Sequence, residues 1–172
     1  ADTALNDETG APLSALAANS GRIEADGGDV LVSARTVSAV IDSVINMDGI
    51  VEARSVGEIN GEIVLDGGER GVVRVAGRLD ASGEESGESG GKVSALGEVL
   101  VGGNFQGNGP EANASVTYVS AGATIQAQAT EDGDGGRVIV WADESTRYYG
   151  EIDVSAGPDG GNGGFVEVSG KQ

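Results

Sequence analysis

The sequence contains no cysteine and no histidine among its 172 residues. These absences exclude disulfide bonds, metal sites built from thiolate or imidazole ligands, and catalytic triads that need a histidine base. Only 3% of the residues are aromatic and three are proline, so few large side chains are present to fill a wide globular core. No apolar run approaches the ~18 residues of a membrane-spanning helix. The composition favours an elongated molecule with a thin core.

Basic residues are also scarce, because 10 Lys and Arg stand against 28 Asp and Glu, for a formal net charge of −18. Binding to nucleic acid or to an anionic membrane surface needs clustered Lys and Arg, so neither is expected as a partner. The acidic surplus favours solubility, and calcium binding at acidic turns is the alternative explanation.

Glycine is abundant, with 31 residues, far above the usual ~7%. Much of it falls in a recurring unit, an alternating apolar strand followed by a Gly-Gly pair and a second alternating strand. The copies occupy residues 21–34, 61–75, 77–95, 123–140 and 150–168. Successive Gly-Gly pairs are 40, 23, 45 and 28 residues apart, which predicts a repeat of roughly 20–25 residues, doubled or lengthened in places.

Each unit has the two-residue period of a strand with one buried face. In residues 73–81 the odd positions are apolar or small and the even positions carry the charges. A β-sandwich could also be built from such strands, but the repeat favours a β-solenoid in which each copy lies over the one before. We predict an all-β solenoid of about seven coils, forming a rod of roughly 30–35 Å.

Stacked copies should bring equivalent apolar residues into inward ladders. One predicted ladder contains Ile23, Ile63, Leu79, Ile125 and Ile152, and a second contains Val30, Val93, Val138 and Val166. Two stretches depart from the repeat and are predicted to be loops or insertions, one near residues 83–91 and one near residues 102–113. No linker is evident, so residues 1–172 are expected to form a single β-helix segment of a larger protein.

Four stretches, residues 53–68, 100–107, 135–150 and 160–171, closely resemble filamentous-haemagglutinin-like exoproteins of two-partner secretion systems. The resemblance covers essentially the whole chain. It implies a right-handed parallel β-helix, in the segment that follows the secretion domain. It also implies export of the parent protein through an outer-membrane transporter, and a secreted or bacterial cell-surface location with a role in adhesion or aggregation.

We therefore expect a structural or adhesive stalk segment that is not an enzyme and needs no cofactor. Its expected partners are the outer-membrane transporter, a host or bacterial surface glycan or protein, and other copies of the chain stacked head to tail. The alternative is a polysaccharide-binding or polysaccharide-processing β-helix, because some enzymes cut polysaccharides with paired carboxylates. Such pairs occur at residues 84–85, 131–132 and 143–144, but with 28 acidic residues they arise without selection for chemistry.

Two acidic glycine-rich stretches, residues 132–136 and 159–164, are reminiscent of calcium-binding nonapeptide repeats. That motif places an aspartate after G-G-x-G, whereas here Gly164 and Phe165 follow. We interpret these glycines as corners between strands.

The few aromatic residues suggest a contact surface, formed by Trp141, Tyr148, Tyr149, Ile139, Arg137 and Phe165. Strand alternation places Trp141 and Ile139 on the outward phase, and the repeat sets Arg137 over Phe165 one coil later, in range of a cation–π contact. We predict an exposed or half-exposed patch that binds a carbohydrate or protein. Packing beneath a loop, such as residues 144–147, is the alternative.

Overall fold

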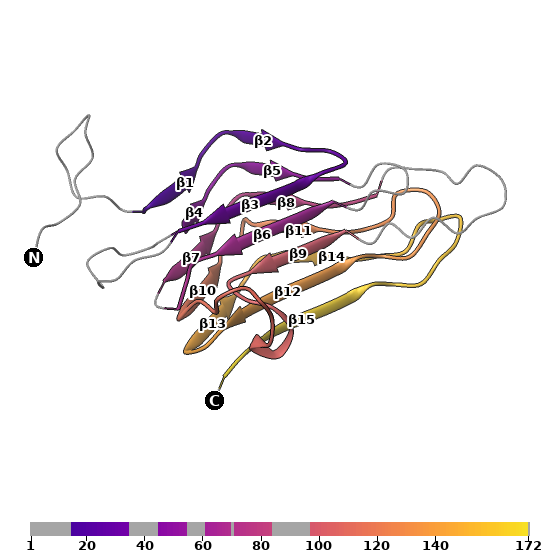
Figure 1. Cartoon of the computed structure of the whole chain (residues 1–172). Coiled ribbons are helices and arrows are strands. Elements are labelled where there is room, and N and C mark those ends of the chain that lie inside the picture. The colour runs from indigo at the N-terminus through magenta and orange to yellow at the C-terminus, as the bar shows by residue number, and fades with distance from the viewer. Residues whose placement is uncertain (1–14, 35–44, 55–60, 70, 84–96, 172) are drawn as a thin grey trace, which may run out of the picture.

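The structure is a computed structural model, and it describes residues 15–34, 45–54, 61–69, 71–83 and 97–171. Within these ranges the chain forms fifteen strands and one short 3-10 helix. The strands belong to three sheets of five strands each, and every strand pairing within them is parallel. The chain is therefore a parallel β-helix, as the alternating repeat predicted (Figure 1).

The three sheets, called B, C and D, each receive one strand from every coil. Sheet B consists of β1 (Ala17–Asn19), β4 (Ile45–Met47), β7 (Val72–Val75), β10 (Val116–Val119) and β13 (Ser145–Tyr148). Sheet C consists of β2 (Arg22–Glu24), β5 (Ile50–Glu52), β8 (Arg78–Asp80), β11 (Thr124–Gln126) and β14 (Glu151–Asp153). Sheet D consists of β3 (Asp29–Ser33), β6 (Glu62–Asp66), β9 (Glu98–Val101), β12 (Arg137–Ala142) and β15 (Phe165–Gly170).

The described residues make five coils, fewer than the seven predicted from the sequence. The predicted repeat of 20–25 residues is also too short, because residues paired in register lie between 27 positions apart, as Thr124 and Glu151 do, and 46 positions apart, as Arg78 and Thr124 do. The cause is that Gly-Gly pairs mark different corners. Gly27-Gly28 lies between sheets C and D, whereas Gly67-Gly68 lies between sheets D and B.

The inward ladders follow the sequence prediction with two corrections. In sheet C, Ile23, Leu79, Ile125 and Ile152 stack as predicted, and Val51 completes the ladder. Ile63 is wrongly placed in that prediction, because it lies in sheet D between Val30 and Val99. Val138 and Val166 continue the sheet D ladder as predicted, and the predicted member Val93 lies outside the described residues.

The core is a narrow column of Ala, Val, Ile and Leu side chains enclosed by the three sheets. Its central members, among them Val73, Leu79 and Val99, are fully buried. Between sheets B and C the coils approach so closely that a side chain would not fit. A Cβ on Gly49 would lie 2.1 Å from the carbonyl oxygen of Gly21, and one on Gly77 would lie 1.9 Å from that of Gly49. Glycine at this corner lets successive coils hydrogen-bond directly.

Corner side chains also join one coil to the next. At the corner between sheets C and D, the Arg54 guanidinium donates two hydrogen bonds to the Asp26 carboxylate, at 2.6 and 3.1 Å. Asp134 occupies the same kind of position and accepts from the amide and side chain of Asn162, 28 residues later. The hydrogen bonds from Arg54 hold the pKa of Asp26 below its usual value. These contacts keep the corners in register while the apolar ladders fill the interior.

Candidate contact surface

The outer face of sheet D differs from the outer faces of the other two sheets because it carries a column of apolar side chains. Leu31, Val64, Leu100 and Ile139 stack in register on four successive strands, and Glu167 ends the column. Three of them form a second apolar cluster with Trp141, separate from the main core. The strands here read as continuous apolar runs, as is typical of strands covered on both faces. Sheet D therefore has a cover over part of its outer side.

The cover is the insertion at residues 102–113, which folds over β12 and β15 (Figure 1). It contains the short helix η1 (Phe105–Gly107), which begins with Asn104 accepting a hydrogen bond from the Phe105 amide. Gly107 has a φ of +67°, and a Cβ there would meet the Trp141 ring at 2.7 Å. The backbone of the insertion thus lies directly against the indole.

Trp141 points outward from its strand, as alternation predicted, but the expectation that it would be exposed is wrong. It is 7% exposed and Ile139 is fully buried. The indole Nε1 donates to Asp143 at 3.1 Å, and the same carboxylate accepts from Asn113 of the insertion at 3.2 Å. The covering segment is the insertion rather than residues 144–147. Trp141 and Ile139 are packing residues that hold the insertion on the sheet.

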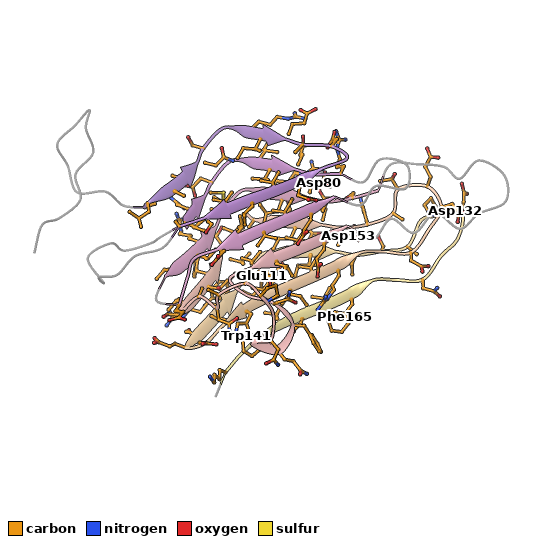
Figure 2. The ribbon with its side chains drawn as sticks, in the orientation of Figure 1. Asp80, Glu111, Asp132, Trp141, Asp153 and Phe165 are labelled. Carbon is orange, nitrogen blue, oxygen red and sulfur yellow. The ribbon has the colours of Figure 1, made fainter. Side chains whose placement is uncertain are left out.

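Arg137 and Phe165 do lie in register on adjacent strands, but the cation–π contact predicted between them is made with another ring. The Arg137 guanidinium lies 5.6 Å from the centre of Phe105, and Phe105 meets Phe165 edge to face at 5.7 Å. Arg137 also pairs with Glu98 at 2.9 Å. Phe105 and Phe165 remain 37% and 47% exposed. Sequence reasoning missed Phe105, although it lies within the insertion that had been identified. Figure 2 shows Phe165 and Trp141 on this side of the molecule.

The two neighbouring tyrosines point in opposite directions. Tyr148 continues the inward ladder of Val75 and Val119 in sheet B and packs against the main core, so its placement on the contact surface is wrong. Burial raises the pKa of Tyr148 to about 12. Tyr149 is 59% exposed and lies 5.8 Å from the Tyr118 ring. The six predicted contact residues therefore do not form one patch.

Beside the insertion, the outer face of sheet D contains a groove of about 350 Å³. Strands β3 and β6 form its floor, with Leu31 and Val64, and the insertion contributes Pro110 and Glu111 to one wall. Carboxylates from the two strands, Asp29, Glu62 and Asp66, also line it. Nothing in the sequence analysis pointed to this groove, although the apolar outward residues of β3 and β6 were a visible signal.

The acidic glycine-rich turns act as corners between coils. Asp134 accepts hydrogen bonds from Asn162, and a Cβ on Gly161 would lie 1.9 Å from the Gly133 carbonyl oxygen. Within the described ranges, no group of three or more Asp or Glu side chains converges to hold a metal ion. The predicted carboxylate pair at residues 84–85 lies outside those ranges, as does most of the predicted loop at 83–91. In the predicted pair at residues 143–144, the Asp143 carboxylate accepts hydrogen bonds from Trp141 and Asn113.

A scan against protein-family models found no match for this chain, and a search of curated proteins found none either. In the described part of the chain, no helix is long and apolar enough to cross a membrane. What is established is the fold, a parallel β-helix of five described coils whose sheet D carries a folded insertion.

Proposed function

We propose that the chain is a structural and adhesive stalk segment of a secreted bacterial surface exoprotein. The observation that carries the proposal is the uninterrupted stacking of five coils into three parallel sheets. With coils about 4.8 Å apart, such a stack lengthens steadily as coils are added. A stack of this kind is suited to holding a binding surface away from a cell.

The outer faces of the stack support the adhesive part of the proposal. A loop can be inserted between strands without interrupting the ladders inside, as residues 102–113 are inserted between β9 and β10. The insertion carries Phe105, which stays exposed with Phe165, and Tyr149 is exposed elsewhere. Exposed aromatic side chains on a chain of net charge −18 are suited to contacts with a surface glycan or protein.

Export through an outer-membrane transporter belongs to the same proposal and rests on the resemblance to filamentous-haemagglutinin-like exoproteins. The observation that tests it is the reading frame of the parent protein together with its neighbouring genes. A linked gene for an outer-membrane transporter barrel would support two-partner secretion. A parent protein with cytoplasmic enzyme domains on either side of this segment would contradict it.

Adhesion is tested with beads that carry the purified chain, scored for attachment to cultured cells and to bacterial surfaces. The doubly substituted variant Phe105→Ser/Phe165→Ser should attach about 10-fold less, because it removes the exposed aromatic pair. Ile50→Ser, which removes an exposed apolar side chain from sheet C, is the matched control and should attach normally. No attachment by the unmodified chain to either surface would contradict the proposal.

A glycan array combined with an assay for new reducing ends separates adhesion from polysaccharide processing. The stalk proposal predicts no release of reducing ends from any glycan that the chain binds. Turnover of a bound polysaccharide would replace this proposal with an enzymatic one.

A further inference from the structure

The apolar column on the outer face of sheet D extends further than its cover. Leu100 and Ile139 lie beneath the insertion and are at most 1% exposed, and Val64 is 9% exposed. Leu31, one strand further along the column, is 67% exposed. The corresponding outward column of sheet B holds Ala18, Asn46, Arg74, Tyr118 and Arg147. An uncovered leucine that continues a buried apolar column leaves room for a further apolar group on β3 and β6.

The groove at this place is rimmed by carboxylates of sheet D and of the insertion. Asp29, Glu62 and Glu98 stack in one column, and Glu111 of the insertion lines the groove from the other side. Arg137 pairs with Glu98. Among the ion pairs of the described residues, none includes Asp29, Glu62 or Glu111.

The mutual repulsion of these groups is visible in the ionisation of Glu62. Burial raises the pKa of the Glu62 carboxyl, and the charges of Glu98, Asp29 and Glu111 raise it further. A positive charge placed between them would relieve both the repulsion and the cost of holding Glu62 ionised. The groove therefore combines an apolar floor with a rim that favours a cation.

We propose that this groove binds an extended segment of a partner protein in which an apolar side chain is followed by lysine or arginine. The apolar side chain packs on Leu31, Val64 and Pro110, and the cation pairs with Glu62 and Glu111. The proposal does not depend on the adhesive role, since the groove is a property of the folded chain wherever it is located.

Size and geometry favour a peptide side chain over other cations. The groove volume of about 350 Å³ lies at the small end of ligand pockets, so it accommodates side chains rather than a large cofactor. The described carboxylates do not converge as metal ligands. An ammonium or guanidinium group bonds with separated carboxylates, because it has several N–H donors.

The test is a titration of the isotope-labelled chain with the peptide acetyl-Leu-Lys-Leu-Lys-amide, followed by NMR chemical shifts. Saturable shifts at Leu31, Glu62, Val64 and Glu111, with a Kd below about 1 mM, are expected. The peptides acetyl-Leu-Glu-Leu-Glu-amide and acetyl-Ser-Lys-Ser-Lys-amide remove the cation or the apolar group, and each should bind at least about 10-fold more weakly.

Two groove variants and two matched controls complete the experiment. Leu31→Ser and Glu62→Gln/Glu111→Gln should each weaken binding of the Leu-Lys peptide about 10-fold. Ile50→Ser and Glu151→Gln change an exposed apolar residue and an exposed carboxylate of sheet C, and they should leave binding unchanged. The proposal is overturned if the peptide gives no saturable shifts, if the shifts lie outside the groove, or if the groove variants bind as the controls do.

Discussion

Ile139 and Leu31 occupy the same outward column of sheet D, yet Ile139 is fully buried and Leu31 is 67% exposed. The insertion lies over Ile139 but does not extend as far as Leu31. Both residues point away from the core, so strand phase alone does not decide how much water each side chain meets. The same substitution should therefore lower the free energy of unfolding much more at Ile139 than at Leu31.

Aspartate substitutions make this difference measurable. Val140→Asp places an unpaired charge in the main core and should lower the free energy of unfolding by about 4 kcal/mol or more. Ile139→Asp should also cost several kcal/mol, because the residue is buried beneath the insertion. Leu31→Asp should cost less than about 1 kcal/mol. Urea unfolding of the three variants tests this. If Ile139→Asp lowers the free energy of unfolding by less than about 1 kcal/mol, the insertion does not cover the sheet in solution.

Tyr148 gives a prediction about pH. Its hydroxyl is buried with no hydrogen-bond partner in the described structure, and burial raises its pKa from 10.0 to about 12. The unfolded chain therefore loses this proton at lower pH than the folded chain, so stability should fall as pH rises from about 10 towards 12. Tyr148→Phe should remove this part of the pH dependence and cost little at neutral pH, because no hydrogen bond is lost.

The measurement is urea unfolding of both proteins at about pH 7 and about pH 11, with a phenolate absorbance titration of each folded protein. The difference between the two titrations isolates Tyr148 and should have its midpoint at about 12. A difference curve with an ordinary midpoint near 10 would show that the Tyr148 hydroxyl is open to water.

At the scale of elements, strands were predictable because alternation directly reflects one buried and one wet face. It identified Val73, Val75, Val138 and Val140 as inward residues, and all four are fully buried. The insertion was located, but its fold was not predictable, since a glycine-rich loop carries no periodicity that fixes its direction. The missed signal was the unbroken apolar run at residues 138–142, which is typical of a strand covered on both faces.

The packing of the insertion on Trp141 is tested by fluorescence, because this is the sole tryptophan in the chain. The native emission should be blue-shifted and poorly quenched by acrylamide. Gly107→Ala places a Cβ 2.7 Å from the indole at a φ of +67°, a conformation that costs a residue with a Cβ about 1–2 kcal/mol. It should lift the insertion and make Trp141 quenchable, with the circular dichroism of the sheets unchanged.

Gly122→Ala is the matched control, since a Cβ there meets no atom within 4 Å and no left-handed φ is involved. It should leave the emission as in the native chain. Efficient quenching of Trp141 in the native chain would contradict the covered arrangement on which the whole outer layer of sheet D depends.

For the whole molecule, the sequence predicted a solenoid correctly, because only stacking makes use of repeated inward residues such as Leu79 and Ile125. It gave the wrong coil length because a Gly-Gly pair does not reveal which of three corners it occupies. Short strands add to the difficulty, since all five strands of sheet C and two strands of sheet B, β1 and β4, are only three residues long. The register between coils is set by hydrogen bonding between their strands. The spacing of repeats along the sequence does not determine that register where an insertion, such as residues 102–113, separates two strands.

The stack also predicts self-association of this chain. Strands β3 and β15 lie at the two outer positions of sheet D and each pairs with one strand only in the described structure. The inward ladder ends at Val30 on one side and at Val166 on the other, and Val166 and Val168 are about 40% exposed. Continuing the register would place Val166 over Val30 of a second copy, which would bury Val166 and pair the open strand edges.

We therefore expect head-to-tail association that increases with protein concentration. Salt should promote it, because screening weakens repulsion between copies of net charge −18. Analytical ultracentrifugation over a range of concentrations, at low and high salt, measures it.

Val168→Lys places a charge on the inward face of the open strand and should reduce the association constant about 10-fold or more. Phe165→Lys introduces the same charge on the outward face of that strand, where it remains in water, and should associate more strongly than Val168→Lys. A strictly monomeric profile at high concentration and high salt, or equal behaviour of the two lysine variants, would show that the inward ladder is not the surface through which copies meet.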